Sequence, residues 1–511
     1  MVNDHQFRKL SLEERVEFFE KIFDEVRTAA DIQEEDIQNK RKLLEEYYTS
    51  GQWLEDYESD EKGLLPADLR RGVLAQDAVY DLLEETAMDR CSIKYQTYVK
   101  ILERELVCAM GCTEPIALAY CAAKARAVLG TLPERIQVAA SGNIIKNVKS
   151  VVVPNTGGRC GIETAAAIGA LGGDENAGLQ VIAGVTDEVR EKLGAYLAQT
   201  EIKVSALESD CLLDMIITVS SGNENAKVRI ANEHTNIVRI EKDGKVLFEK
   251  DLQTEDADDL PDYDLLTVKD ICTFACTCNL DDVRGVLDRQ IELNTAISRE
   301  GLRHSYGANI GKVLLKTGSG VRTRAKAAAA AGSDARMNGC DMPVVICSGS
   351  GNQGMTTSLP VIEYAKELGV DKEKLYRALL ISNLVTIHAK SGIGRLSAYC
   401  GAVSAGAGAG AGIAFLYGGG VKDISHTIVN ALAISSGIVC DGAKSSCAAK
   451  IAMAVESGIF GFEMYQNGQE FYDGQGLVLK GVERSIANFS RLGRVGMRQT
   501  DREIILMMTN Q

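Results

Sequence analysis

Residues 396–421 read LSAYCGAVSAGAGAGAGIAFLYGGGV, a stretch without a charged residue. It is long enough for a membrane helix, but most of its residues are Gly, Ala and Ser rather than Leu, Ile or Phe. Small residues bury little apolar area, and they let backbones or a bulky cofactor approach closely. The stretch therefore predicts tightly packed backbone inside the core of a soluble protein rather than a membrane span.

Three cysteines lie within or shortly after this stretch. Cys400 belongs to it, and Cys440 and Cys447 follow in the segment VCDGAKSSCAAK, residues 439–450. Each is flanked by small residues, which leave room for an inorganic group, and thiolates in such settings bind zinc or iron–sulfur clusters. The chain has 14 cysteines, so spacing alone also permits the alternative that these three are buried, inert thiols.

The overall composition is that of a soluble globular protein. The 511 residues are 45% hydrophobic and 25% charged, and a chain of this length predicts about three domains. The first residues, MVNDHQFRKL, lack the apolar run of a secretory signal, so we expect a cytoplasmic location in which cysteines stay reduced. The net charge of −15 argues against binding to nucleic acid.

Residues 1–90 differ from the rest in charge. They contain 24 Asp and Glu against 12 Lys and Arg, a net of −12, whereas the remainder of the chain carries −3. Ser11 and Glu14 predict a capping box at the start of a helix. We interpret the segment as an acidic helical N-terminal domain whose charged face is either solvated or a docking surface. Helices are expected over residues 11–29, 31–48 and 76–88.

The rest of the chain predicts an α+β fold in two parts. Residues 91–265 form a mixed α/β region, with a helical pattern over 95–130 that is interrupted near AMGCTEP. Further helices are expected over 163–173 and 179–198. Residues 266–511 are expected to be mostly helical and Gly-rich, and they contain the three cysteines. Strands are predicted at IQVAA, VKSVVV, KVSAL, MIITVSS, KVRIAN, NIVRI and KVLFEK.

Cys112 stands in GCTEPIALA, directly before a predicted helix. The N-terminus of a helix stabilises a thiolate, which predicts a lowered pKa and makes Cys112 a candidate base or ligand. A structural cysteine at a helix entry is the alternative. His234, in the polar and turn-like setting NEHTNIV, is a candidate contact for a ligand.

Three Gly-rich segments predict loops that offer backbone N–H groups to an anion. Any one of them fits a tight turn equally well, but three in one chain indicate a small anionic substrate. The segment at residues 347–355 also supplies the amide side chains of Asn352 and Gln353. They are VPNTGGRCG (153–161), AGSDARMNG (331–339) and CSGSGNQGM (347–355).

Over about residues 95–511 the chain resembles the iron–sulfur L-cysteine desulfidases, relatives of the α-chain of the iron–sulfur L-serine dehydratases. The motifs that carry the resemblance occur in the same order in that family: GCTEPIALA, VPNTGG, HTNIV, GSDARM, SGSGNQG, RLSAYCGA, VCDGAKSSCAAK and QTDREII. Residues 1–90 resemble a small uncharacterised helical domain family that occurs elsewhere as a separate module.

The resemblance implies a lyase that uses a [4Fe-4S] cluster to convert L-cysteine to pyruvate, ammonia and hydrogen sulfide. It implies that Cys400, Cys440 and Cys447 hold the cluster, and that Cys112 is the base or a displaceable fourth ligand. Because Cys112 precedes the helical part, we expect the site to lie between the two parts of the α+β region.

The resemblance further implies a small amino-acid substrate, with no nucleic acid or membrane as partner, and it leaves a homo-oligomer open. Residues 333–336 and 348–354 are expected to hold the carboxylate or the amine of the substrate. The implied substrate-binding residues are Ser348, Asn352, Gln353, Asn155, His234 and Asn236.

Three alternatives stay open. The same chemistry could act on L-serine, although the serine dehydratases have a further cysteine in their C-terminal tail and this chain ends REIILMMTNQ. A pyridoxal-phosphate lyase would use Lys444 or Lys450 for its Schiff base and SGSGNQG for the phosphate. A cluster-bearing redox sensor without turnover is favoured by the acidic N-terminal domain alone.

Overall fold

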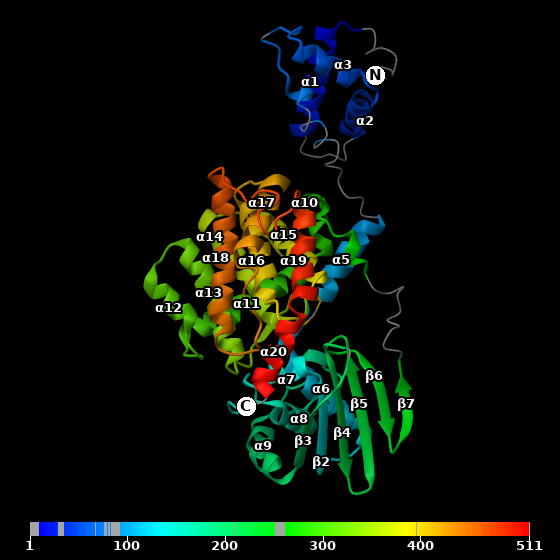
Figure 1. The fold of residues 1–511 in the computed structure, drawn as a ribbon, viewed down its shortest axis with the longest axis vertical. Helices are drawn as coiled ribbons and strands as arrows, with labels where there is room; N and C mark the ends of the chain where they lie inside the picture. Colours follow the sequence, from blue (N-terminus) through cyan, green and yellow to red (C-terminus); the bar gives the residue numbers. More distant parts are fainter. Residues whose placement is uncertain are drawn as a thin grey trace. The chain divides into compact units, whose positions relative to one another are not determined.

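The computed structural model (Figure 1) describes residues 10–28, 35–66, 68–75, 79, 82, 92–209, 211–250, 261–394 and 396–509. It divides the chain into two compact units. The first comprises Met1–Asp89 with Cys276–Cys278, and the second comprises Arg90–Ala275 with Asn279–Gln511.

The first unit contains α1 (Leu12–Thr28), α2 (Glu35–Thr49), α3 (Gln52–Glu61) and a short 3-10 helix, η2 (Gly72–Leu74). The predicted capping box is confirmed, because the backbone N–H of Ser11 donates to Glu14 Oε2 at 3.0 Å and that of Glu14 donates to Ser11 Oγ at 3.4 Å. In the core, buried Asp56 accepts hydrogen bonds of 2.8 Å from Arg15 Nε and from the Tyr47 hydroxyl. Most of the helix predicted over 76–88 lies outside the described residues.

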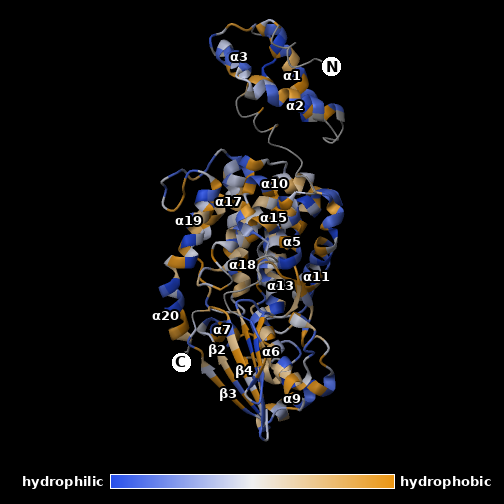
Figure 2. Ribbon diagram, turned by 90° about the vertical axis from the view of Figure 1, so that its right-hand side faces the viewer, coloured by the Kyte–Doolittle hydropathy of each residue, from blue (hydrophilic) through white to orange (hydrophobic). Residues whose placement is uncertain are grey.

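A six-stranded mixed sheet forms one part of the second unit. The strand order is β3-β2-β4-β5-β6-β7, in which β2 and β3 are parallel and the other pairs are antiparallel. Apolar residues run along β2 and β4 (Figure 2) and pack in one core with helices α6 and α8. The strands are β2 (Arg135–Ala140), β3 (Glu201–Ala206), β4 (Asp214–Ser221), β5 (Glu224–Ala231), β6 (Ile237–Lys242) and β7 (Lys245–Glu249); the helices beside them are α6 (Thr113–Leu129), α7 (Gly142–Val148), α8 (Ile162–Gly172) and α9 (Asp187–Gln199).

Three expectations for local structure are wrong. The run VKSVVV is not a strand: α7 occupies its start, and Val152 makes only isolated bridges to Cys160 and Asn338. The helix expected over 179–198 begins only at Asp187, where the side chain of Thr186 caps it. The segment 331–339 is not a loop, since helix α13 (Val321–Met337) continues through most of it.

The other part of the second unit is helical, as predicted, and α16 runs through its core (Figure 1). Added to Gly406 of α16, a Cβ would lie 2.2 Å from the carbonyl oxygen of Ala454 in α18; added to Gly458, it would lie 2.1 Å from that of Gly406. The Gly- and Ala-rich stretch therefore lets two helix backbones touch, as expected. The helices are α5 (Ile93–Glu105), α10 (Val268–Thr277), α11 (Arg284–Arg303), α12 (Ile310–Thr317), α13, α14 (Gly351–Leu368), α15 (Lys372–Ser391), α16 (Gly401–Leu416), α17 (Val421–Ser435), α18 (Cys447–Gln466), α19 (Val482–Arg491) and α20 (Arg498–Thr509).

Within the described ranges, none of the helices combines the length and the apolar character that a membrane crossing requires.

A short two-stranded sheet joins the two parts of the second unit. Strand β1 (Cys108–Met110) pairs antiparallel with β8 (Pro343–Val345). Beyond the paired residues, the Thr113 hydroxyl donates a hydrogen bond of 3.0 Å to the carbonyl oxygen of Gly349. This hydrogen bond joins the GCTEP motif to the SGSGNQG motif.

Candidate active site

The N-termini of four helices meet at one cavity of about 110 Å³. Cys112 is the N-cap of α6, Ser350 that of α14 and Cys400 that of α16, while Cys447 is the first residue of α18. All four residues line the cavity, and Cys440 lines it from a loop. Because a helix N-terminus carries a partial positive charge and unpaired N–H groups, the cavity favours an anionic occupant.

A short backbone pairing places Cys400 beside Cys440. The N–H of Cys400 donates to the carbonyl oxygen of Ile438 at 3.1 Å, and the N–H of Cys440 donates to that of Ala398 at 2.6 Å. The loop from Cys440 to Cys447 turns at Gly442, which has a φ of 89°. The glycine is required there also by space, since a Cβ would lie 2.3 Å from the carbonyl oxygen of Lys146.

The chemistry of these three thiols fits an iron–sulfur cluster. Burial raises the pKa of Cys400 to about 12, and the neighbouring Cys440 adds to the rise; burial also raises the pKa of Cys447. Thiols gathered in this way bind a metal as thiolates, and their protons are released to water. In the described part of the chain, no three His, Cys, Asp or Glu side chains converge on a single metal ion. A four-iron cube binds each thiolate at a different iron, so its ligands need not converge.

Cys112 packs in a small apolar cluster with Val151 and Met337, against which Cys447 also lies. Its thiol donates a hydrogen bond of 3.0 Å to Glu114 Oε2. The expected lowering of its pKa is wrong: burial and the carboxylate of Glu114 raise the pKa well above its usual value, against an opposing effect of Arg336. Desolvation and the adjacent negative charge outweigh the helix N-terminus at this position.

Glu114 connects Cys112 with His234. Its Oε1 accepts a hydrogen bond of 3.1 Å from Asn147 Nδ2 and lies 3.8 Å from His234 Nε2. Burial acts to raise the pKa of Glu114, but His234 and the Cys112 thiol lower it to about 2. The carboxylate is thus ionised and stands between a thiol and an imidazole, each of which is buried.

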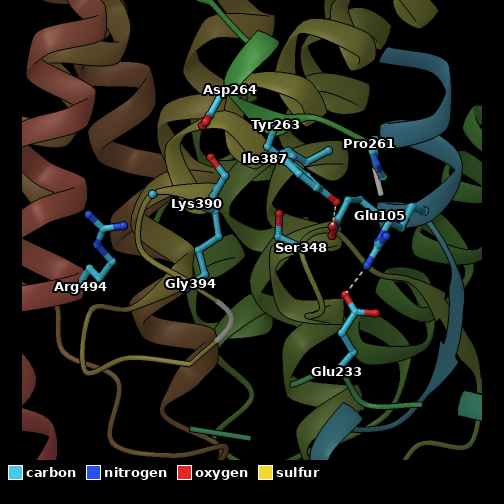
Figure 3. Close-up of a pocket in the computed structure, with 13 residues that line it drawn as sticks. Glu105, Glu233, Pro261, Tyr263, Asp264, Ser348, Ile387, Lys390, Gly394 and Arg494 are labelled. Carbon is cyan, nitrogen blue, oxygen red and sulfur yellow. Dashed lines mark hydrogen bonds and ion pairs between the residues drawn. The ribbon is translucent and has the colours of Figure 1, made fainter. Parts of the chain in front are cut away.

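The structure distributes the other predicted substrate residues over several places. Asn352 and Gln353 line the cysteine cavity. Ser348 lines a larger neighbouring cavity of about 440 Å³ (Figure 3), and Lys390 lines both cavities. Asn155 and Asn236 line neither of these two cavities: their amide groups donate hydrogen bonds of 2.9 Å to the backbone carbonyl oxygens of residues 182 and 231.

Two cavity residues, Glu114 and Lys390, were not predicted as site residues from the sequence. Glu114 had a signal, because it lies two residues after Cys112 in the first turn of a helix. Arg336 was not named by itself, but it belongs to residues 333–336, which were expected to hold the substrate. Lys390, near the end of α15, had none, because only the tertiary packing brings it to the cavity.

The fold and the cavity define an α+β protein with a thiol-lined site at converging helix N-termini. The chain belongs to the serine dehydratase alpha chain family, whose model matches residues 176–506. Residues 11–90 match a domain of unknown function, DUF4298. The resemblance to the dehydratase α-chains and the presence of a separate N-terminal module are thereby confirmed.

Curated relatives cover about four fifths of the chain at high identity. A UPF0597 protein of Desulfitobacterium hafniense is 56% identical over 425 residues, which is 83% of this chain and 99% of the relative. A UPF0597 protein of Lachnoclostridium phytofermentans is 52% identical over 418 residues, covering 81% of this chain and 100% of the relative. One of Finegoldia magna is 48% identical over 407 residues, covering 80% and 97%.

Family membership supports a lyase or dehydratase role, and members of the family commonly bind an iron–sulfur cluster. The names of the relatives state no activity.

Proposed function

We propose that the protein is an iron–sulfur-dependent lyase that eliminates hydrogen sulfide from L-cysteine and yields pyruvate and ammonia. The observation that carries the proposal is the meeting of Cys400, Cys440, Cys447 and Cys112 at one cavity that accepts an anionic occupant.

Cys400, Cys440 and Cys447 would hold a [4Fe-4S] cluster. Held by three thiolates, such a cluster has one iron without a protein ligand, and this iron supplies a Lewis acid toward the leaving group. The small residues Gly401 and Ala443 beside the cysteines leave space for it.

The elimination balances without an oxidant or a reductant. The Cα–H bond breaks, its electron pair forms the Cα=Cβ bond, and the Cβ–S bond breaks so that sulfur leaves with the other pair. The resulting aminoacrylate tautomerises to an imine, which water hydrolyses to pyruvate and ammonia. Among the chain's own residues, Cys112 is our candidate for the base. It would act as the thiolate, and the 3.0 Å hydrogen bond from its thiol to Glu114 fixes the position of the sulfur. Glu114, with a pKa of about 2, is too weak a base to take the thiol proton, which is released to water before the thiolate accepts the proton from Cα.

The surroundings of Lys444 and Lys450 support this reading over a pyridoxal-phosphate lyase. Lys444 Nζ lies 2.5 Å from Asp441 Oδ1, and Lys450 Nζ pairs with the same oxygen. Lys450 Nζ also donates to the carbonyl oxygen of Val439 at 2.8 Å. A Schiff-base lysine needs a free, uncharged amine, whereas Lys444 is held in an ion pair and, against the effect of burial, Asp441 raises the pKa of Lys450.

L-Serine is the second candidate substrate, and the match to the serine dehydratase alpha chain family favours it. The same residues would act, with hydroxide in place of sulfide as the leaving group.

The deciding experiment measures pyruvate and sulfide from L-cysteine and, in parallel, pyruvate from L-serine. The full-length protein is purified and reconstituted with iron and sulfide without oxygen. Pyruvate and sulfide from cysteine alone establish the desulfidase. Pyruvate mainly from serine establishes the dehydratase. An intact cluster with neither product contradicts the lyase and leaves the redox sensor as the better explanation.

A further inference from the structure

The side chain of Arg336 is almost completely buried, at 1% exposure, in the last turn of α13. Its Nη1 donates to Asn352 Oδ1 at 3.2 Å. Its Nε and Nη2 have no hydrogen-bond partner within the described chain, and they are buried. The ionised Glu114 lines the same cavity but accepts hydrogen bonds from Cys112 and Asn147. Buried guanidinium donors without acceptors are unfavourable, so these two donors indicate a ligand that supplies the missing acceptors.

The guanidinium of Arg336 lies beside the N-terminus of α14. A Cβ added to Gly351, the first residue of that helix, would lie 2.4 Å from Arg336 Nε. The guanidinium therefore rests against the positive end of a helix, where a second positive charge is unfavourable. An anion beside them would be stabilised by both groups.

Elsewhere in this chain the same two nitrogens of arginine bind a carboxylate. Arg229 donates from Nε and Nη2 to the two carboxylate oxygens of Asp214, at 2.9 and 2.6 Å. Arg15 does the same toward Asp56, at 2.8 and 2.5 Å. This pair of parallel donors matches the planar carboxylate group. Arg336 presents the same pair to a cavity in which the described residues supply it with no carboxylate.

The side chain of Gln353 offers a hydrogen-bond acceptor, which complements the donors of Arg336. It belongs to the first turn of α14, its side chain is 5% exposed, and its Oε1 has no hydrogen-bond partner in the described residues. It packs against the start of α16, since a Cβ added to Gly401 would lie 2.8 Å from this oxygen. An unpaired amide oxygen there would accept a hydrogen bond from an ammonium group.

We infer that Arg336 binds the α-carboxylate of the substrate through Nε and Nη2, and that Gln353 accepts from its α-ammonium. The cavity is thus built for the zwitterionic head of an α-amino acid, beside the cysteines where the side-chain leaving group would lie. The inference rests on the proposed function, in which the substrate is an amino acid.

The test uses L-alanine, which has both head groups but no leaving group, with propionate and ethylamine as probes of each half. Their dissociation constants are measured by calorimetry on the reconstituted full-length protein and on the variants Arg336→Met and Gln353→Leu. The matched control is Arg322→Met, on the same helix but paired with Glu456 and Glu463 outside the cavity. Iron content and melting temperature are measured for each protein.

We expect Arg336→Met to weaken L-alanine and propionate by about 100-fold or more, as for the loss of one partner of a buried charge pair, and to leave ethylamine unchanged. Gln353→Leu should weaken L-alanine and ethylamine but not propionate. Iron content should stay at the wild-type level. If Arg336→Met does not fold, Arg336→Lys, which keeps the charge but loses the paired donors, should still weaken propionate.

Three outcomes overturn the inference. They are unchanged binding of L-alanine to a folded Arg336 variant, equal loss of all three ligands, and loss of iron, which would mean that Arg336 serves the cluster instead. These readouts do not depend on turnover. Arg336-dependent binding of L-alanine without pyruvate from cysteine or serine would refute the proposed elimination alone, while pyruvate formation with an indifferent Arg336 would refute this inference alone.

Discussion

The Cys112 thiol donates its proton in a 3.0 Å hydrogen bond to Glu114, two residues further along the chain. The geometry gives the thiol a fixed hydrogen-bond acceptor inside a buried site. It also explains why the helix N-terminus does not produce a thiolate by itself: the carboxylate that accepts the hydrogen bond also raises the pKa of the thiol. Glu114 is therefore a positioning residue for the chemistry proposed at Cys112.

Changing Cys112 to Ala should remove the activity and leave most of the cluster, because the three proposed ligands remain. Changing Glu114 to Gln should lower kcat by about 100-fold, as for a reacting group that is no longer held in position, with little change in KM. Pyruvate formation and iron content measure the two effects. Glu163→Gln, an exposed glutamate in the first turn of α8, is the matched control and should behave as wild type.

Either of two results would contradict this assignment. Loss of the cluster in the Cys112→Ala protein would make Cys112 a true fourth ligand rather than a base. Wild-type kcat in the Glu114→Gln protein would show that the hydrogen bond does not position the thiol for the reaction.

Changing Cys400, Cys440 or Cys447 to Ala should abolish both the broad cluster absorbance and the activity, because each of the three is proposed to hold a separate iron. Anaerobic reconstitution followed by absorbance, iron analysis and the pyruvate assay measures the outcome. Cys160→Ala, at an exposed cysteine outside the cavity, should keep the full cluster. Full activity in any one of the three variants would refute the ligand set.

The local structure can be predicted from the sequence except where a glycine serves helix packing rather than a turn. The strands between residues 203 and 250 follow from local patterns, and so does the buried, Gly-rich α16. The loop expected at 331–339 is instead helix, because its glycine serves packing: a Cβ on Gly332 would lie 2.5 Å from Met355 Sδ. In the same way Gly354 lets α14 approach the carbonyl oxygen of Val345. A single sequence shows that a residue is small but does not show which neighbour requires it.

In the candidate site, too, some residues can be recognised from the sequence and others only from their tertiary contacts. The cysteines and the GCTEP motif stand out by residue type and setting, so they can be selected from the sequence. The roles of Arg336 and Glu114 depend on buried donors and acceptors whose partners come from distant segments. Asn155 and Asn236 were selected by their motifs, and in the structure their amides donate to backbone carbonyl groups.

The stability of the protein should depend on pH through Asp334. Burial raises the pKa of this carboxyl from 3.8 to about 6, although the N–H of Gly311 donates to its Oδ2 at 3.0 Å. The folded state then holds a proton that the unfolded chain has lost, so this contribution is present below pH 4 and is lost as the pH rises through 6. The loss amounts to about 3 kcal/mol for a shift of about two pKa units.

Asp334→Asn should remove that dependence, since the amide keeps an acceptor for Gly311 and never ionises. We expect the melting temperature of the variant to match the wild type below about pH 4, to exceed it increasingly up to about pH 6, and to keep a constant difference above that pH. Asp341→Asn, at an exposed neighbouring aspartate, should show no such divergence. Parallel pH curves for the Asp334→Asn and wild-type proteins would mean that the carboxyl is already charged at low pH.

Gly406 should control both the stability of the helical core and the retention of the cluster. Adding a methyl group there places carbon 2.2 Å from the carbonyl oxygen of Ala454, so Gly406→Ala must push α16 and α18 apart. These helices begin at the cavity with Cys400 and Cys447, and their separation moves two proposed ligands away from each other. Overpacking of this kind costs about 1–3 kcal/mol or more, so both the melting temperature and the iron bound per chain should fall.

Gly437→Ala, where nothing lies within 4 Å of the added carbon, is the control and should change neither quantity. A Gly406→Ala protein with wild-type melting temperature and iron content would show that the contact between the two backbones is not needed to hold the site together.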